Sequence, residues 1–361
     1  MSSRRSPLLA AGILALLAVV AAVAYFGADV AGTKEAGAPA DPAGVPDGEP
    51  VARVAAQVAP SVVQVNVRAV QETPFGTQEG EGLGSGVIYR RDGFVLTNNH
   101  VVEGASEVNI AFADGTTEQG EVVGTDPATD LAVVRVDRRG LPAASFGDAR
   151  DLTVGELAVA IGSPSGFQST VTSGVVSGVG REVPAELTGG RQETSLVDLI
   201  QTDAAISPGS SGGALANRDG EVVGINVAYL PPAETGAESI GFAIPAYTAT
   251  SVADQLIENG EAVGPYMGVS LTDLAPETAR RFGVEAEFGA LVAEVEPSGP
   301  AARAGIQAGD VVTALGEQEV RGSGDLVSAL RRYVPGDRVE VTVLRDGAEE
   351  RINLRLGERA G

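Results

Sequence analysis

The sequence predicts a mainly β protein with two globular parts, because two strand patterns follow each other along the chain. From about residue 51, short runs rich in Val, Ile and Leu are separated by Gly, Pro and Asp-Gly turns, which is typical of a β-barrel or sandwich. From about residue 264, short strands alternate with two helical stretches, which indicates a smaller α+β domain. Hydrophobic residues make up 43 % of the chain, enough for a core in each part.

An apolar segment near the N-terminus is long enough to cross a bilayer. Residues 7–28 carry no charge and follow two arginines within residues 1–6. A membrane-spanning helix needs about 20 apolar residues, whereas the core of a signal peptide has about 7–15. We therefore expect a transmembrane anchor, with signal cleavage near residues 22–24 as the alternative, and an extracytoplasmic location for the rest. Residues 29–50, rich in Pro, Gly and Ala, are expected to form a flexible linker.

The first globular part is expected to span residues 51–260. Its predicted strands include "SVVQVNV", "GSGVIYRRDGFVLTNN", "EVNIAFADGTT", "LAVVRV", "ELAVAIG", "TVTSGVVSGV" and "GEVVGINVAYL". Helices are predicted only at Glu49–Val58 and Tyr247–Asn259.

The second globular part is expected to span residues 264–358. Its predicted strands are "YMGVSL", "GALVAEV", "DVVTALG", "RVEVTVLR" and "ERINLRL". Helices are predicted at "GPAARAG" and at "SGDLVSALRRY", where Leu326 and Leu330 lie four positions apart on one face.

The composition excludes several kinds of function. A net charge of −23 argues against nucleic-acid binding, which needs a basic surface. The absence of cysteine excludes disulfides, thiolate zinc sites and a cysteine nucleophile, and a single histidine excludes a histidine-rich metal site. No segment has the spacing of a calcium-binding loop. We therefore expect no metal and no cofactor.

The one histidine, His100 in "TNNHVV", is followed by Asp130 in "DPATDLAVVRV" and by Ser211 in "QTDAAISPGSSGGAL". The order His, Asp, Ser is that of the chymotrypsin-type arrangement. There the imidazole takes the serine proton and a buried carboxylate orients the imidazole. Each residue taken singly has a structural interpretation, as a buried histidine, a turn aspartate or a loop serine.

The segment "PGSSGGAL" favours the catalytic interpretation. Glycines at 209, 212 and 213 tolerate backbone angles that would turn the amides of Gly209 and Ser211 toward one point, as in an oxyanion hole. A glycine-rich hairpin is the structural alternative.

The motifs "GSGVIY", "GFVLTNNHVV", "TDLAVVRV", "AIGSPSGF", "QTDAAISPGSSGGAL" and "IGFAIP" follow one another as in the HtrA (DegP-like) family of trypsin-fold serine proteases. The resemblance runs from about residue 52 to the end, where "YMGV" and "SGPAARAGIQAGDVVTALG" are similar to that family's PDZ domain. It implies a trypsin-like double β-barrel with the site in the cleft between the barrels. It also implies His100 as base, Asp130 as orienting acid and Ser211 as nucleophile. Asp126 is the alternative acid, but it lies outside the strand of the family motif.

The chain departs from the common family motif at Ser207 and Ser210, where asparagine is usual, and at Ala214, where proline is usual. Because the nucleophile and the glycines of the loop are unaltered, we expect these changes to affect the catalytic rate and the rigidity of the loop rather than to abolish activity.

In trypsin-fold proteases the residue six positions before the nucleophile lies at the base of the specificity pocket. Here that residue is Ala205, with Ile225, Asn226 and Val227 as the expected wall. An uncharged base cannot compensate a buried Lys or Arg, so small or aliphatic substrate side chains are predicted.

In PDZ domains an X-Φ-Gly-Φ loop binds a C-terminal carboxylate, and the peptide pairs as an added strand. Residues 266–269 match that loop, so the amides of Met267, Gly268 and Val269 are the expected cradle. The alternative is a domain that only packs on the protease.

Together these features predict a single-pass, extracytoplasmic serine endopeptidase that degrades unfolded or damaged envelope proteins and binds C-terminal peptides. The resemblance implies protein quality control and a homotrimer. Two alternatives stay open, a catalytically idle chaperone or scaffold, and a regulatory protease with one dedicated membrane partner.

Overall fold

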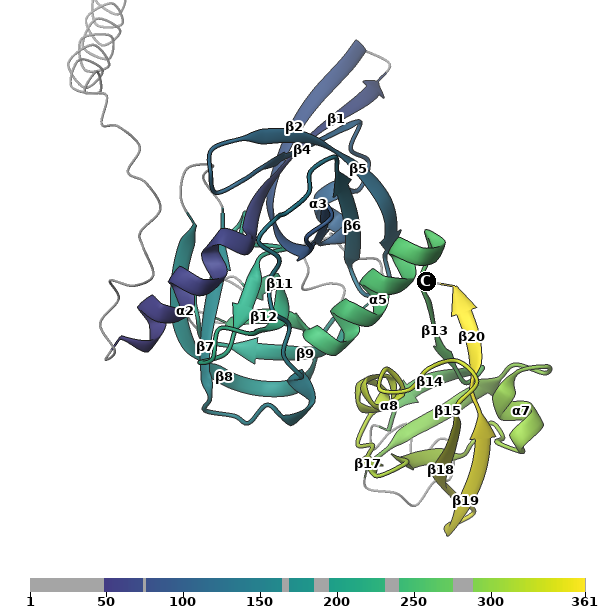
Figure 1. The fold of residues 1–361 in the computed structure, drawn as a ribbon. Helices are drawn as coiled ribbons and strands as arrows, with labels where there is room; N and C mark the ends of the chain where they lie inside the picture. Colours follow the sequence, from purple (N-terminus) through teal and green to yellow (C-terminus); the bar gives the residue numbers. More distant parts are fainter. Residues whose placement is uncertain are drawn as a thin grey trace, which may run out of the picture. The chain divides into compact units, whose positions relative to one another are not determined.

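The computed structural model describes residues 49–73, 76–163, 169–184, 195–230, 240–274 and 288–360. The predicted anchor at residues 7–28 and nearly all of the predicted linker at 29–50 lie outside these ranges. No helix within the described ranges is long and apolar enough to cross a membrane. The described chain folds into two closed β-barrels followed by a smaller mixed domain (Figure 1). The strand patterns predict a barrel or sandwich followed by an α+β domain, and the family resemblance implies the double barrel.

The first barrel closes in the order β1-β2-β3-β6-β5-β4, and all neighbouring strands are antiparallel. Its strands are β1 (Val62–Thr73), β2 (Gly76–Arg90), β3 (Phe94–Thr97), β4 (Glu107–Ala111), β5 (Thr117–Asp126) and β6 (Leu131–Val136). Valine and isoleucine dominate its interior, because β-branched side chains pack well on a pleated surface. Strand β3 pairs with β6 through Thr97 and Ala132, so the end of β3 lies beside the turn that precedes β6.

The second barrel closes in the order β10-β11-β12-β9-β8-β7, again antiparallel throughout. Its strands are β7 (Leu157–Gly162), β8 (Thr170–Val183), β9 (Leu196–Thr202), β10 (Ala214–Ala216), β11 (Val222–Leu230) and β12 (Ile240–Pro245). Ser211 lies just before the short strand β10, which is held between β7 and β11.

Two helices pack against the barrels at the positions that the sequence predicts. They are α2 (Pro50–Val58) and α5 (Ala246–Asn259), and a short helix, α3 (Asn99–Val102), follows β3. Single 3-10 turns occur at η2 (Ala59–Ser61) and η3 (Ala149–Asp151). Helix α5 ends at Gly260, whose φ of 78° is the left-handed conformation that terminates helices. One apolar cluster contains side chains from both barrels and from both longer helices, so the barrels share a core.

The C-terminal domain is a twisted antiparallel sheet with two helices. The sheet runs in the order β14 (Val269–Asp273), β15 (Ala290–Val295), β16 (Val311–Leu315), β18 (Arg338–Arg345) and β19 (Ala348–Arg355), with β17 (Gln318–Glu319) beside β16. The helices are α7 (Pro300–Ala304) and α8 (Ser323–Leu330). The predicted strand "YMGVSL" is divided, because the chain turns at Met267 and Gly268 before β14 begins.

A separate two-stranded ribbon joins the two ends of this domain. Strand β13 (Val263–Tyr266) pairs antiparallel with β20 (Gly357–Ala360), so that Val263 lies opposite Ala360. The ribbon extends one residue before and two residues after the predicted range of 264–358.

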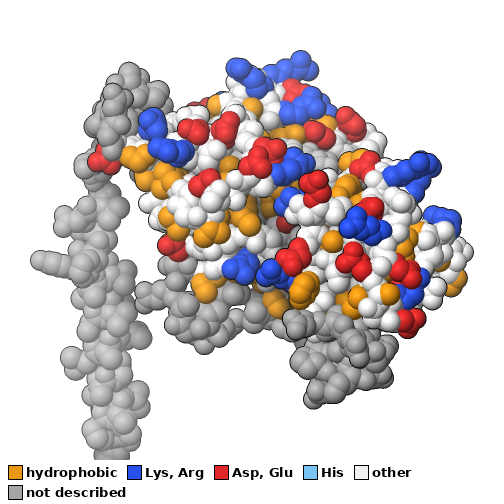
Figure 2. Space-filling model, turned by 90° about the horizontal axis from the view of Figure 1, so that it is seen from below, with side chains coloured by type: hydrophobic (Ala, Val, Ile, Leu, Met, Phe, Trp, Pro, Cys, Tyr) orange, Lys and Arg blue, Asp and Glu red, His pale blue; other side chains and the backbone are white. Residues whose placement is uncertain are grey.

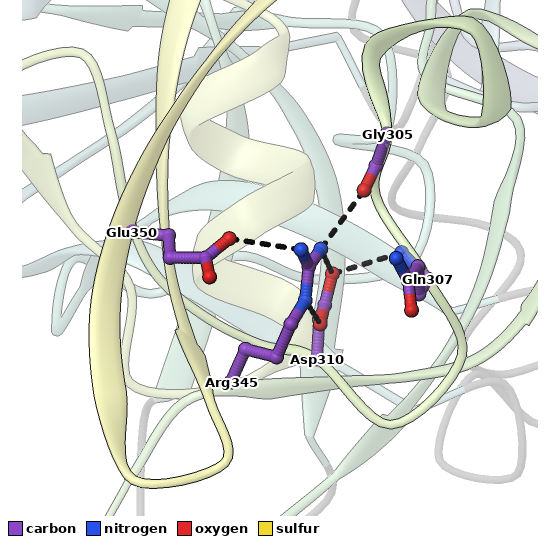
Figure 3. Close-up of polar contacts among 5 residues, drawn as sticks. All are labelled: Gly305, Gln307, Asp310, Arg345 and Glu350. Carbon is purple, nitrogen blue, oxygen red and sulfur yellow. Dashed lines mark hydrogen bonds and ion pairs between the residues drawn. The ribbon is translucent and has the colours of Figure 1, made fainter.

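An ion pair between a partly exposed arginine and a buried carboxylate fixes the turn that follows α7 (Figure 3). Arg345 donates to both carboxylate oxygens of Asp310 at 2.7 Å, and also to the carbonyl of Gly305 at 2.9 Å. The same carboxylate accepts from the amide of Gln307 at 2.8 Å, while Glu350 accepts a further hydrogen bond from the guanidinium. Asp310 is buried, and its bidentate pairing raises the pKa of Arg345. The helix α7 is thereby tied to the sheet.

Charge is mixed on the surface that Figure 2 shows. Acidic and basic side chains are interspersed there, so on this face the negative net charge is not gathered into one region.

Candidate active site

The imidazole of His100 is held by Asp130 from two sides. The Nδ1 atom lies 2.7 Å from Oδ2 of Asp130, and the backbone N–H of His100 donates to Oδ1 at 3.0 Å. The Asp130 side chain is fully buried, whereas the imidazole is 13 % exposed. A carboxylate only accepts hydrogen bonds, so the neutral imidazole carries its proton on Nδ1 and presents Nε2 as a base.

The turn that carries Asp130 is built for this contact. It connects β5 to β6, and Asp130 adopts a φ of 58°, in the left-handed region that aspartate tolerates better than most residues. The carbonyl of Asp130 accepts hydrogen bonds from the amide of Asn99 at 3.1 Å and from Nδ2 of Asn98 at 2.9 Å. The turn is therefore fastened to the start of α3, the helix of His100.

The alternative acid, Asp126, has a different role. It is 4 % exposed and accepts from the hydroxyl of Thr129 at 2.5 Å and from the amide of Ala128 at 3.3 Å. No hydrogen bond among the described residues joins it to His100. Burial raises the pKa of this carboxyl. Asp126 thus closes the turn, and Asp130 contacts the imidazole.

Three further polar residues were not singled out in the sequence, and one of them bonds to this turn. Arg331, the residue after α8, donates to the carbonyl of Val197 at 2.8 Å and to that of Ala128 at 3.2 Å. Asp198 is buried and accepts a hydrogen bond from the hydroxyl of Tyr247. Burial raises the pKa of both members of that pair and lowers the pKa of Arg331.

The backbone of the serine loop leaves two amides free. Three amides between residues 209 and 213 donate to carbonyls, namely Ser210 to Ser207 at 2.9 Å, Gly212 to Asn226 at 2.8 Å and Gly213 to Ser210 at 3.0 Å. The other two belong to Gly209 and Ser211, and they donate to no group within the described residues. These are the two amides that the sequence predicts for the oxyanion hole.

Glycine is required at two positions of this loop. Gly209 and Gly212 have φ values of 89° and 84°, in the region that side chains other than glycine rarely adopt. A Cβ on Gly212 would also lie 2.1 Å from the carbonyl oxygen of Ser85.

The hydroxyl of Ser211 is hydrogen-bonded to strand β11 and not to the imidazole. It donates to the carbonyl of Val227 at 3.3 Å, and no hydrogen bond in the described structure joins it to His100. The structure therefore brings together His100 and Asp130 but leaves the Ser211 hydroxyl turned toward β11. Rotation about one side-chain bond redirects a serine hydroxyl, and catalytic hydrogen bonds often tighten only when substrate is bound.

Ser85, in the motif "GSGVIY", contacts the serine loop directly. Its hydroxyl donates to the carbonyl of Gly209 at 2.7 Å, and its amide donates to the carbonyl of Ser211 at 2.7 Å. The sequence showed this serine only as part of a family motif. A contact between residues 124 positions apart has no local sequence signal.

The four residues predicted for the specificity pocket differ in accessibility. Ala205 is exposed, and its carbonyl accepts from the hydroxyl of Thr172 at 2.7 Å. Ile225, Asn226 and Val227 are buried, and Ile225 belongs to the apolar cluster shared by the barrels. Only Ala205 among the four presents its side chain to solvent.

The carbonyl groups of the loop predicted to hold a peptide carboxylate are hydrogen-bonded to neighbouring segments. The carbonyl of Met267 accepts from the amide of Ala301 in α7 at 2.8 Å, and that of Gly268 accepts from Glu296 at 2.9 Å. The amides of Met267 and Gly268 donate to no group within the described residues. Gly268 has a φ of 79°, a left-handed conformation that glycine adopts readily. Such a conformation can turn successive backbone amides toward one anion. Val269 begins β14, the edge strand of the described sheet.

Comparison with known proteins identifies both globular parts. Residues 84–225 match the family model "Trypsin-like peptidase domain", and residues 265–356 match "PDZ domain". The chain is 42 % identical over 282 residues to a probable periplasmic serine endoprotease, DegP-like, from Halomonas elongata, covering 78 % of this chain and 58 % of that protein. It therefore spans about three-fifths of the length of that relative.

Two further proteins are similar over more of their length. The serine protease Do-like HtrB of Bacillus subtilis is 38 % identical over 327 residues, covering 85 % of this chain and 70 % of HtrB. The solved structure of the HtrA-type protease AlgW with decapeptide aligns with a TM-score of 0.66 at 35 % identity, covering 86 % of this chain and 98 % of that one. With these matches over both globular parts, the chain belongs to the HtrA family of trypsin-like serine proteases with a PDZ domain.

Proposed function

We propose that this protein is a serine endopeptidase in which Ser211 is the nucleophile, His100 the general base and Asp130 the acid that orients the base. The observation that carries the proposal is the buried Asp130 carboxylate bonded to both Nδ1 and the amide of His100. The names of the relatives, a probable serine endoprotease and a serine protease, support the same activity.

In this mechanism the Ser211 hydroxyl turns from the Val227 carbonyl toward Nε2 of His100 and attacks the substrate carbonyl. Its proton passes to Nε2, which later returns a proton to the departing amine. Asp130 stays ionised and stabilises the imidazolium. Water then attacks the acyl-enzyme by the same route, and Ser211 is regenerated.

The negative oxygen of the tetrahedral intermediate would lie at the amides of Gly209 and Ser211. Both amides are free to donate because no other described group accepts from them. Fixed donors of this kind act where charge develops and need no reorganisation during the reaction.

Substrates of this site are proposed to be unfolded chains cut after small or aliphatic residues. Ala205 supplies no carboxylate to pair with a buried Lys or Arg. The PDZ domain is proposed to bind C-terminal peptides, with the free amides of Met267 and Gly268 taking the carboxylate and the edge strand β14 pairing with the peptide.

We place the activity outside the cytoplasm, with residues 7–28 as a single-pass anchor. The periplasmic location in the name of the DegP-like relative and the apolar N-terminal segment support this placement. A homotrimer is the assembly that the family resemblance implies.

The proposal is tested by digestion of unfolded casein with Ser211→Ala beside Ser210→Ala. Both variants lose one hydroxyl in the same loop. Because members of a triad act as a unit, Ser211→Ala should reduce the rate by about 10³-fold or more. The neighbouring Ser210→Ala should stay within about tenfold of the unmodified chain, since its hydroxyl has no part in the reaction. Equal rates for Ser211→Ala and the unmodified chain would refute the assignment.

A further inference from the structure

Ser85 is a fully buried residue of the first barrel whose hydrogen-bonding groups are all used. Its amide donates to the Ser211 carbonyl, and its hydroxyl donates to the Gly209 carbonyl. The same hydroxyl accepts from the amide of Ser163 at 2.8 Å, and its carbonyl accepts from the hydroxyl of Thr97 at 2.7 Å. Ser85 therefore joins strand β2 of the first barrel to two segments of the second.

The direction of the Ser85 hydroxyl hydrogen is fixed by these partners. The amide of Ser163 can only donate, so it occupies a lone pair of Oγ. A serine hydroxyl has one hydrogen, which must then point at the carbonyl of Gly209, 2.7 Å away. A buried hydroxyl between a donor and an acceptor cannot reverse without leaving both unpaired, which is costly.

The two hydrogen bonds that Ser85 donates, to the carbonyls of Gly209 and Ser211, lie on either side of one peptide group. The peptide between Gly209 and Ser210 is held at its carbonyl by Ser85 and at its amide by Ser207. The peptide between Ser211 and Gly212 is held at its carbonyl by Ser85 and at its amide by Asn226. Between them lies the peptide whose N–H belongs to Ser211. Its neighbours on both sides are fixed to the same residue.

We propose that Ser85 is a positioning residue that aims the amide of Ser211 at the oxyanion of the reaction. The inference rests on the proposed function, because it assigns the free amides of the loop to the tetrahedral intermediate. Gly209 favours such a device, since glycine at a φ of 89° has no side chain to restrict its neighbouring peptide.

The test is steady-state cleavage of a peptide substrate by Ser85→Ala in the full chain, with the active-site concentration determined by titration. Loss of one oxyanion-hole donor lowers kcat by about 10²–10³-fold, so loosening of one donor should lower kcat by about tenfold or more. KM should change by less than about twofold. A peptide boronic acid forms a tetrahedral adduct with the nucleophile, and its affinity should fall by the same factor as kcat.

Thr202→Val is the matched control. The Thr202 hydroxyl is also buried, donates to the carbonyl of Val175 at 2.8 Å and accepts from the amide of Ala204 at 3.1 Å. Both variants remove a hydroxyl that bridges a carbonyl and an amide, so both should lower the melting temperature. Only Ser85→Ala should lower kcat and the boronate affinity together.

Should Ser85→Ala not fold, Ser85→Cys keeps the shape and offers only a weak S–H donor, and the same pair of losses is expected from it. Unchanged kcat and boronate affinity in the folded Ser85 variant, or equal losses in Thr202→Val, would overturn the proposal. An unmodified chain without activity, or an active Ser211→Ala, would instead overturn the proposed function itself.

Discussion

Asp126 and Asp130 lie at the two ends of one turn, and both are buried, yet their surroundings give them different roles. Asp126 folds back on its own turn through Thr129 and Ala128. Asp130, in the left-handed region, points its carboxylate to the start of α3 and both of its oxygens to His100. The difference comes from backbone conformation, because the two side chains are identical.

The two acids therefore give a sharp comparison. Asp130→Asn would keep the shape but allow the imidazole to place its proton on Nε2, so that the base is blocked. The corresponding change in trypsin lowers kcat by about 10⁴-fold, and we expect a loss of about 10³–10⁴-fold here. Asp126→Asn, the same change four residues earlier, should stay within about tenfold. Casein or peptide cleavage by the two variants measures this, and equal losses would contradict the assignment of Asp130.

Asp126 also makes stability depend on pH. Burial raises the pKa of this carboxyl, partly opposed by the hydroxyl of Thr129, the amide of Ala128 and the charge of Arg331, while Asp130 adds to the rise. A raised pKa means that the contribution of Asp126 to stability is fully present below the unfolded value, about 3.9, and is lost as pH rises through the folded value.

Asp126→Asn should thus gain stability relative to the unmodified chain as the pH increases. The melting temperatures of the two proteins, measured between pH 4 and pH 8, should diverge in favour of the variant toward higher pH. A difference that is constant with pH, or that grows toward acid, would show that Asp126 is not held at a raised pKa.

At the scale of elements, local sequence predicts the positions of the strands and helices far better than it predicts which elements pair with one another. The β-branched runs place the strands, and apolar spacing predicts α5 to within one residue and the start of α8, which ends at Leu330, three residues before the predicted end. The exception is "YMGVSL", where a glycine in the left-handed region divides one apolar run into two strands. An apolar run alone does not show where the backbone turns.

That division creates the loop proposed to hold a carboxylate. Peptides with an apolar C-terminus should bind the PDZ domain, and amidation of the terminal carboxylate should weaken binding by about tenfold or more. Charge-assisted hydrogen bonds from the amides of Met267 and Gly268 are lost with the charge. Calorimetry with paired acid and amide peptides measures this, and equal affinities would refute the cradle.

Two glycine substitutions distinguish an effect on the geometry of this loop from the destabilisation that any side chain at positive φ causes. Gly268→Ala puts a side chain at a φ of 79°, with its Cβ 3.2 Å from atoms of Gly299 and Pro300. Gly347→Ala does the same at a φ of 76° in the open turn between β18 and β19. The left-handed strain costs about 1–2 kcal/mol in both. Only Gly268→Ala should lower the affinity of the PDZ domain for the peptide with a free C-terminal carboxylate.

At the scale of the whole molecule, the sequence predicts the residues of the proposed site but not all of the residues that hold them in place. His100, Asp130 and Ser211 can be predicted because a lone histidine and a glycine-flanked serine are conspicuous residues in a family motif. The register of two closed barrels decides which other side chains meet them. Ser85 reaches Gly209 across 124 residues, and Tyr89 reaches Asp254 across 165. No periodicity within one strand encodes such pairs.

The first and last residues of the PDZ domain are determined by pairing between two distant segments, β13 and β20. A fragment of residues 264–358 would lose Val263, Arg359 and Ala360, and with them two of the four residue pairs of the β13 and β20 ribbon. A fragment of 263–360 keeps all four. Two adjacent antiparallel pairs share about two backbone hydrogen bonds, so we expect the longer fragment to be more stable toward urea by roughly 1–3 kcal/mol, at about 0.5–1.5 kcal/mol for each bond. Identical unfolding midpoints would show that the ribbon does not support the domain.

The same ribbon determines how the domain responds to mechanical force. Its first residue, Val263, lies opposite Ala360, near the end of the chain, and the pairing proceeds inward from there to Tyr266 and Gly357. A pull that separates these two ends loads the hydrogen bonds one pair after another rather than all together. The ribbon should open like a zipper at low force, while the sheet and its Asp310–Arg345 ion pair stay folded. Tension along the chain would thus first open this ribbon and leave the sheet of the domain folded.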